Sequence, residues 1–259
     1  MSLLLTIDAG NTNIVLGLFR DDKLVHHWRI HTDRKKLLDE YTDQIASFLA
    51  KEGVKKGDIT EVAISSVVPS MARLLDGIAV EYFGVTPFKV SHKNRMNIKL
   101  AIENPAELGA DLIAAAVAGV EKYGTPLIII DMGTATTVTA INRDKELAGV
   151  AIMPGLAISC EALYRFAPHL PRIPLEMPPS VIGKNTVESM QAGIFIGYGH
   201  MMEGIIGDMK QILGEDAKVI STGGLSSLFN KGSLKSKPDF DDEDLVIEGI
   251  RLLSRMQQK

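Results

Sequence analysis

The sequence predicts a duplicated α/β fold with mixed β-sheets. Residues 8–17 read DAGNTNIVLG directly behind the apolar run at residues 3–7, and residues 131–140 read DMGTATTVTA behind the apolar run at residues 127–130. Each half then continues as strands joined by short turns, followed by alternating helices and strands, an order typical of an α/β fold. The two aspartates lie 123 positions apart (131 minus 8), nearly half of the 259 residues. We therefore expect two domains, at residues 1–122 and 123–259.

The first half begins with three predicted strands, at residues 3–7, 13–19 and 24–31, the last two joined by the polar turn RDDK. Helical spacing of apolar residues predicts a helix over 39–51. The run EVAISSVVP at 61–69 predicts a strand that leads into a helix near Pro69, and a further short strand is expected at 86–91.

A helix is predicted from Asn104 to the glycine at position 124. Asn104 is a favoured N-cap residue, Pro105 suits the first helical position, and Glu107 completes the spacing of a capping box. The helix would carry the segment AELGADLIAAAVAGVEKYG.

The second half repeats the order of the first. We expect the following elements: strands at 127–131, 134–141, 146–152 and 218–221, helices near 156–166 and 186–213, and a terminal helix from about 242. Residues 231–244 read as a polar surface loop whose acidic run caps the terminal helix. A metal site formed by Asp241, Asp242 and Asp244 is the alternative.

Composition excludes several classes of function. The chain is 46% apolar and 23% charged, with a formal net charge of −4, which offers no basic surface for nucleic acid or an anionic membrane. No run approaches the ~20 apolar residues of a membrane span. A single cysteine, Cys160, fits a reducing compartment, and we expect it to be a packed small residue. The sequence therefore favours a cytoplasmic protein.

The repeated phrase has a chemical interpretation. A glycine in a hairpin turn lets another group approach the main chain, and the backbone N–H groups of such a turn form an anion-binding concavity. Side-chain hydrogen-bond donors are added by Asn11, Thr12, Thr134 and Thr136. The carboxylate of Asp8 suits the Mg²⁺ that accompanies a bound phosphate, because Mg²⁺ prefers oxygen ligands. Two such turns facing each other would clamp a nucleoside triphosphate, with TGG at 222–224 as a third loop, near the nucleoside. The alternative is a pair of ordinary β-hairpins.

These motifs resemble those of the type III pantothenate kinases. The resemblance covers nearly the whole chain and rests on the following segments: DAGNTNIVLG at 8–17, SSVVP at 65–69, ENPAELGAD at 103–111, DMGTATT at 131–137, PG at 154–155, GKNT at 183–186 and TGG at 222–224. It implies two ribonuclease-H-like domains of the actin-like ATPase type, with mixed sheets and a nucleotide cleft between them. It also implies ATP-dependent phosphorylation of pantothenate, with Mg²⁺ and a monovalent cation, K⁺ or NH₄⁺, as cofactors.

The resemblance assigns roles position by position. Asp111 would accept the proton of the substrate hydroxyl, Asp131 would bind the monovalent cation, and Asp8 would contact Mg-ATP indirectly. The residues implied to bind ATP and its phosphates are Asp8, Ala9, Gly10, Asn11, Thr12, Asn13, Ile14, Val15, Gly133, Thr134, Gly223 and Gly224. Those implied to bind pantothenate are Ile102, Gly109, Ala110, Asp111, Leu112 and Thr186. An acid in the apolar stretch around Asp111 fits a positioned catalytic carboxylate, the alternative being a surface acid on an amphipathic helix.

One position departs from the family pattern. The family reads Gly-Ala-Asp-Arg where this chain has Leu112, and leucine offers no donor for the pantothenate carboxylate. Three outcomes are open: another cation, Arg165, Lys184 or Arg172, replaces the arginine; the kinase is weak or uses a less acidic substrate; or the chain is an inactive relative that acts as a nucleotide-binding regulatory protein. A chaperone- or filament-like member of the superfamily is a further alternative.

The segment from 190 to 209 is nearly apolar around its predicted helix. A helix that packs against its own core on one side does not require so many apolar positions. The members of the family that the chain resembles are dimers. We therefore expect this helix at the two-fold interface of a homodimer. The remaining partners expected are pantothenate and ATP, without nucleic acid or membrane.

Overall fold

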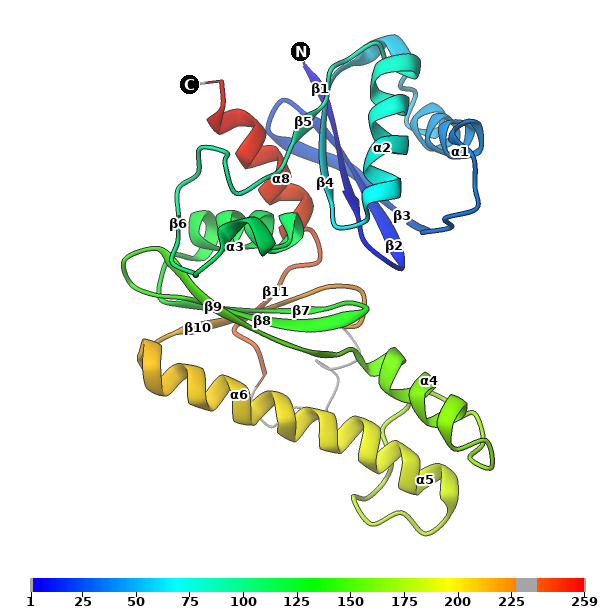
Figure 1. Cartoon of the computed structure of the whole chain (residues 1–259), viewed down its shortest axis with the longest axis vertical. Helices are drawn as coiled ribbons and strands as arrows, with labels where there is room; N and C mark the ends of the chain where they lie inside the picture. Colours follow the sequence, from blue (N-terminus) through cyan, green and yellow to red (C-terminus); the bar gives the residue numbers. More distant parts are fainter. Residues whose placement is uncertain (1, 227–236, 259) are drawn as a thin grey trace. The chain divides into compact units, whose positions relative to one another are not determined.

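The computed structural model describes residues 2–226 and 237–258, which form two compact units (Figure 1). The first unit contains the chain up to Glu121 together with the C-terminal segment from Asp244, and the second contains Lys122–Glu243. The chain therefore passes between the units twice. The first passage lies between Glu121 and Lys122, and the second, between Glu243 and Asp244, returns the terminal helix to the first unit.

The first unit contains a five-stranded sheet in the order β3-β2-β1-β4-β5. Its strands are β1 (Leu3–Ala9), β2 (Asn13–Arg20), β3 (Lys23–His31), β4 (Ile59–Ser66) and β5 (Phe88–Lys89). The first three are antiparallel neighbours, while β4 and β5 pair in parallel with the strands before them. The sheet is mixed, as predicted.

Helices cover both faces of this sheet (Figure 1). They are α1 (Leu38–Lys51), α2 (Pro69–Gly77) with its π-helical continuation Ile78–Tyr82, α3 (Ala110–Tyr123) and α8 (Leu245–Met256); two short 3₁₀ turns (Lys56–Asp58, Pro105–Glu107) and the strand β6 (Lys99–Leu100) complete the elements. Alternate residues of β1, Leu3, Leu5 and Ile7, pack against α1 and α2 in one buried core.

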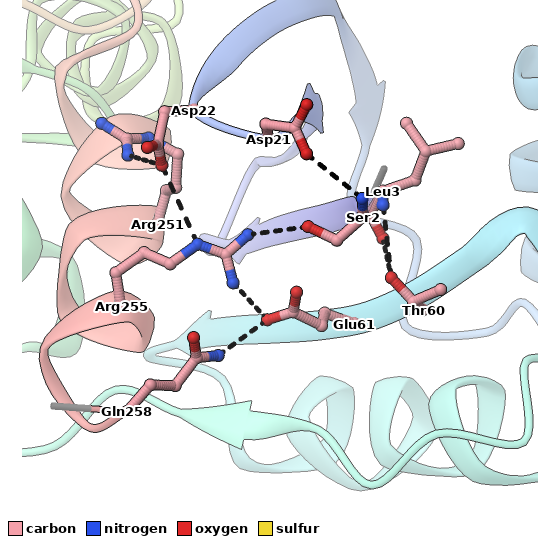
Figure 2. Close-up of polar contacts among 9 residues, drawn as sticks. All are labelled: Ser2, Leu3, Asp21, Asp22, Thr60, Glu61, Arg251, Arg255 and Gln258. Carbon is pink, nitrogen blue, oxygen red and sulfur yellow. Dashed lines mark hydrogen bonds and ion pairs between the residues drawn. The ribbon is translucent and has the colours of Figure 1, made fainter.

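The C-terminal helix α8 packs against β1, β2 and β4 of the first unit. Figure 2 shows the polar contacts that hold it there. Arg255 donates a hydrogen bond to Glu61 of β4. Arg251 donates a hydrogen bond of 2.7 Å to Asp22, which lies in the turn after β2. Gln258 donates to Glu61 at 2.9 Å. These contacts bind α8 and Gln258 to β4 and to the turn after β2.

The helix predicted from Asn104 begins later than expected. Asn104 does act as a cap, because its side chain accepts from the N–H of Ala106 at 3.3 Å, but the helix it caps is only the 3₁₀ turn Pro105–Glu107. The backbone of Leu108 is extended, and α3 starts at Ala110. Asp111 therefore lies in the first turn of its helix, where the positive end of the helix dipole acts on a carboxylate.

The second unit repeats the topology of the first, which confirms the predicted duplication. Within it the strands follow the order β11-β10-β7-β8-β9. Their bounds are β7 (Leu127–Met132), β8 (Ala135–Ile141), β9 (Glu146–Pro154), β10 (Lys218–Thr222) and β11 (Phe240–Asp241). β7, β8 and β9 are antiparallel, and β10 and β11 pair in parallel.

The helices of the second unit are α4 (Leu156–Phe166), α5 (Thr186–Gln191), a π-helical stretch (Ala192–Ile196) and α6 (Gly197–Leu213). The last three follow one another without a break over the range predicted as a single helix. Phe195, Tyr198 and Met202 are buried against β7 and β8 in the core of this unit. Cys160 is buried in the same core, as predicted.

The acidic run before α8 has another role than capping. Asp244 occupies the N-cap position, but its side chain makes no cap hydrogen bond and pairs instead with His27 at 2.6 Å. Asp242 pairs with Lys122 at 2.6 Å, and Asp241 accepts from Ser221 at 2.8 Å. Among the described residues no cluster of three or more His, Cys, Asp or Glu side chains is suited to a metal ion. Residues 231–236 of the predicted polar loop lie outside the described residues.

In the part of the chain that the structure describes, no helix combines the length and apolar content that crossing a membrane requires.

Candidate functional site

The first repeated phrase forms a hairpin loop between β1 and β2. Ala9 pairs with Ile14, and the N–H of Gly10 donates to the carbonyl of Asn13 at 2.9 Å. The loop tip, Asn11 and Thr12, is exposed. The predicted sequence of strand, glycine turn and strand is therefore present, with polar side chains at the tip.

Asp8 lies at the end of β1 and is half-buried. Its Oδ1 accepts a 2.8 Å hydrogen bond from the hydroxyl of Ser65, the residue beside it in the parallel pair of β1 with β4. Ser65 is fully buried, so this bond fixes the rotamer of the carboxylate. Sequence reasoning gave Ser65 no individual role, although it lies in the SSVVP motif.

Asp111 is half-buried at the start of α3. Burial raises the pKa of its carboxyl, and a 2.8 Å hydrogen bond from the backbone N–H of Leu112 to Oδ1 opposes that rise. The same oxygen lies over Gly109, where any β-carbon would overlap it. Glycine at this position thus leaves room for the carboxylate.

Val67 connects Asp111 with the first loop. Its N–H donates to the carbonyl of Ala9 at 3.2 Å, and its Cγ1 lies 3.5 Å from where a β-carbon of Gly109 would stand. The Gly109–Asp111 segment and the Asp8–Asn13 loop therefore lie at the same end of the first sheet. The structure brings these two predicted groups of site residues together within one unit.

Other predicted substrate positions of the first unit differ in exposure. Ala110 and Ile102 are half-buried. Leu112 is buried, with an exposed fraction of 9%, so the departure from the family pattern places an apolar side chain in an apolar setting. Leucine is accommodated here as part of the interior of the protein.

The second repeated phrase forms a shorter loop, between β7 and β8. Met132 pairs with Thr136, and the N–H of Gly133 donates to the carbonyl of Ala135 at 3.2 Å. The N–H of Gly155, after β9, donates to the carbonyl of Thr134 at 3.1 Å. A β-carbon at position 155 would overlap that carbonyl, so glycine is required for the approach. This observation explains the PG pair at 154–155.

Asp131 lies at the end of β7 beside the third glycine loop. It pairs in parallel with Thr222 of β10, after which Gly223 adopts a φ of +90°. A β-carbon on Gly223 would overlap Oδ1 of Asp131 and lie 2.7 Å from the backbone nitrogen of Met132. Gly223 thus packs directly on the second loop, and Gly224 beyond it is exposed. The second glycine loop and the TGG loop at 222–224, both predicted parts of the site, are therefore adjacent.

Tyr198 is a supporting residue that sequence reasoning assigned no role. Its hydroxyl lies 2.6 Å from the hydroxyl of Thr136 in β8 and 3.0 Å from the carbonyl of Pro154 in β9, so it bridges these two neighbouring strands beside the second loop. Burial raises the pKa of this phenol, which is therefore a neutral hydrogen-bonding group at physiological pH. A tyrosine in an otherwise apolar helical segment was the available signal.

Thr186 is the first residue of α5. Asn185 caps this helix by accepting from the N–H of Glu188 at 2.9 Å. Thr186 lines a cavity of about 300 Å³, whose other walls are mostly apolar: Leu163, Leu170, Ser189, Met190, Gly193 and Ile194. The polar side chains of its lining are those of Thr186 and Ser189.

Comparisons with known proteins agree with these motifs. The family model described as type III pantothenate kinase matches residues 4–208. The chain is 45% identical to the type III pantothenate kinase of Citrifermentans bemidjiense, over 97% of this chain and 98% of that protein. It is 46% identical to the type III pantothenate kinase of an Exiguobacterium species, over 99% and 100% of the two chains.

A solved structure supports the fold. The activator of the 2-hydroxyisocaproyl-CoA dehydratase of Clostridium difficile, solved with bound ADPNP, aligns with a TM-score of 0.60 at 12% identity, over 99% of this chain and 96% of that one. The fold is therefore the duplicated actin-like ATPase fold, as the resemblance implied. On the family match and the full-length identities, the chain belongs to the type III pantothenate kinase family.

Proposed function

We propose that this chain phosphorylates the primary hydroxyl of pantothenate with ATP, the first step of coenzyme A biosynthesis. The observation that carries the proposal is Asp111, a half-buried carboxylate of raised pKa at the same end of the sheet as the glycine loop Asp8–Asn13. The full-length similarity to type III pantothenate kinases supports the substrate.

The two glycine loops are the proposed binding sites of the triphosphate. The first offers the exposed Asn11 and Thr12, and the second offers Thr134, with Gly223 and Gly224 nearby for the nucleoside. Asp8 is held by Ser65 and suits the hydrated Mg²⁺ that accompanies ATP, because Mg²⁺ prefers oxygen ligands and retains several waters. When bound, the metal neutralises charge on the phosphates.

Asp131 is the proposed partner of a monovalent cation, K⁺ or NH₄⁺. Its carboxylate lies directly against the backbone of Gly223, at the edge of the second loop. An anionic oxygen in that position suits a weakly hydrated cation close to the phosphates.

Asp111 is the proposed general base. As the substrate oxygen forms its bond to the terminal phosphorus and the bond to the departing ADP oxygen breaks, the hydroxyl proton passes to Asp111. A raised pKa makes this carboxylate, in its ionised form, a stronger base than an ordinary aspartate. The hydrogen bond from Leu112 N–H orients the oxygen that overlies Gly109.

The cavity beside Thr186 is the proposed site for the apolar part of pantothenate. Since Leu112 is buried and apolar, another residue must supply the cation that binds the pantothenate carboxylate. Arg172 is paired with Glu161 at 3.4 Å and stacks on Tyr164, and the guanidinium of Arg165 lies over the ring of Phe166. Among the residues that the structure describes, neither Arg165 nor Lys184 forms an ion pair like that of Arg172 with Glu161. We therefore propose that Arg165 or Lys184 binds the substrate carboxylate.

A homodimer is also part of the proposal. Along the predicted interface helix, one side is buried in its own unit by Phe195, Tyr198 and Met202. Another set of positions, Gly193, Gly197, Gly204 and Gly207, has open space where side chains would be. Such small residues allow a second helix to approach closely. We further propose a cytoplasmic location, where ATP and the substrate occur together.

The test is a coupled assay of ADP release with the full chain, with and without pantothenate and with K⁺ or Na⁺. We expect saturable, pantothenate-dependent and K⁺-stimulated turnover. Asp111→Asn should lower kcat by about 10²–10⁴-fold, the usual contribution of general-base catalysis, and leave MgATP binding unchanged. Asp43→Asn, an exposed carboxylate of α1, is the matched control.

Nucleotide binding without pantothenate-dependent turnover would reject the kinase and favour a nucleotide-dependent regulator. Wild-type turnover that persists in Asp111→Asn would instead retain the kinase and reject Asp111 as its base.

A further inference from the structure

The segment that follows β3 is bound to the first loop. Thr32, just past the end of β3, donates its N–H to the carbonyl of Thr12 at 2.8 Å. Its hydroxyl donates to the carbonyl of Gly10, also at 2.8 Å. Thr32 is 6% exposed, so its side of both bonds is largely shielded from water. The position of this segment is therefore coupled to that of the loop.

The next residue is fixed from the other side by α1. The N–H of Asp33 donates to the hydroxyl of Tyr41 at 2.7 Å, and that hydroxyl donates to the carbonyl of Asp33 at 3.0 Å. Tyr41 is fully buried. Oδ1 of Asp33 accepts from the N–H of Lys35 at 2.9 Å, which closes a tight turn around Arg34. Two elements thus determine where Arg34 emerges.

Arg34 emerges at the tip of the first loop. Its Nη2 donates to Oδ1 of Asn11 at 2.8 Å, and both residues are exposed. A guanidinium carries five N–H donors in a planar fork, so one bond to Asn11 leaves others for a ligand. The loop otherwise contributes an acid, Asp8, and neutral groups.

We propose that Arg34 binds the phosphates of the nucleoside triphosphate at the first loop. This inference rests on the proposed function, and it adds a cation that the motif alone does not contain. A planar guanidinium matches two phosphate oxygens at once, and such charge-assisted bonds are roughly twice as strong as neutral ones. The turn anchored by Thr32 and Tyr41 keeps Arg34 in place before the nucleotide arrives, which lowers the entropy cost of binding.

The test compares Arg34→Gln with Lys35→Gln, which removes the same charge from the neighbouring exposed position of the same turn. We expect Arg34→Gln to raise the KM for MgATP about tenfold, as loss of a charge-assisted phosphate contact implies, with kcat and the KM for pantothenate nearly unchanged. Lys35→Gln should leave all three constants near wild type. Arg34→Lys should recover part of the loss, since it keeps the charge but not the fork.

Direct binding to the full chain separates phosphate recognition from other causes. Fluorescent analogues of ATP and AMP serve as probes, and Arg34→Gln should weaken the ATP analogue about tenfold but leave the AMP analogue unchanged. Equal losses for both probes, equal effects of the two glutamine variants, or no effect of Arg34→Gln would each overturn the inference. Failure of the proposed function is distinguishable, because the wild-type chain would then show no turnover with pantothenate.

Discussion

The two glycine loops occupy equivalent positions in the two units but are built differently. Three residues, 133–135, lie between the paired Met132 and Thr136, whereas four, 10–13, lie between Ala9 and Ile14. The first loop presents an exposed polar tip, and the second is packed closely by the backbone of its neighbours. The repeated sequence motif therefore occurs at the same position in the topology of each unit, but the two turns differ in length.

The two loops are also held by different forces. Side-chain hydroxyls fix the first, through Ser65 on Asp8 and Thr32 on Gly10. The second is fixed mainly by contact with glycine backbones, at Gly155 and Gly223. We therefore expect an added side-chain atom to disturb the second loop more than the first. Loss of the Ser65 hydroxyl should instead disturb the position of the Asp8 carboxylate beside the first loop.

Adding one methyl group at Gly10 of the first loop, or at Gly155, which packs on the second loop, tests this difference and should give the largest effect. Gly155→Ala places a β-carbon onto the carbonyl of Thr134, which the loop can relieve only by moving. We expect the free energy of unfolding to fall by about 1–3 kcal/mol, as for other overpacked sites. Gly10→Ala meets its nearest atom, the carbonyl of Asn13, at 3.2 Å and should stay within about 1 kcal/mol of wild type.

Denaturant unfolding of both variants measures the effect. A larger loss for Gly10→Ala than for Gly155→Ala would show that the packing difference between the loops has been misjudged.

Removing one hydroxyl from each support gives the next effect. Ser65→Ala removes the hydrogen bond from this hydroxyl to the carboxylate of Asp8, and kcat/KM for MgATP should fall about tenfold, equivalent to about 1.4 kcal/mol. Tyr198→Phe removes the bridge between Thr136 and Pro154, and the expected loss is mainly in stability, about 1 kcal/mol.

The measurements are steady-state kinetics and thermal unfolding of both variants. Ser70→Ala, an exposed serine of α2, is the control for Ser65→Ala. If Ser65→Ala retains wild-type kinetics, Asp8 does not depend on this hydroxyl.

The smallest effect concerns the cost of a half-buried carboxylate. Because the pKa of Asp111 is raised in the folded chain, folding favours its protonated form. This contribution to stability is present below the pKa that Asp111 has in the unfolded chain, near 3.9. It is lost as the pH rises through the higher pKa that Asp111 has in the folded chain. Asp111→Asn should therefore be more stable than wild type at pH 7, and the gain should disappear in acid.

Thermal unfolding at pH 7 and at pH 3.5 reads this difference, with Asp43→Asn as the exposed control. A gain of the same size at both pH values would contradict the assigned effect of burial.

The sequence predicted the elements of both units because apolar runs and glycine turns are local signals. It predicted the start of α3 wrongly: Asn104 caps a 3₁₀ turn, and the extended backbone at Leu108 then allows Gly109 to pass beneath Asp111. That break depends on the contact between residues 109 and 111, which spacing does not reveal.

Supporting residues were beyond the sequence for a related reason. Ser65 and Tyr198 act through partners 57 and 62 positions away, and such pairs become visible only when strands and helices are packed. The acidic run at 241–244 is similar, since Lys122 and Ser221 determine its role. The return of α8 to the first unit likewise depends on contacts such as that of Arg255 with Glu61.

Both glycine loops are proposed to bind nucleotide phosphates. Calorimetric titration of the full chain with the nonhydrolysable analogue ADPNP and Mg²⁺ is the most direct measurement, with Ser65→Ala and Gly155→Ala titrated in parallel. We expect saturable binding to the wild-type chain that each substitution weakens. Binding that neither substitution changes would reject the two loops as the phosphate-binding elements.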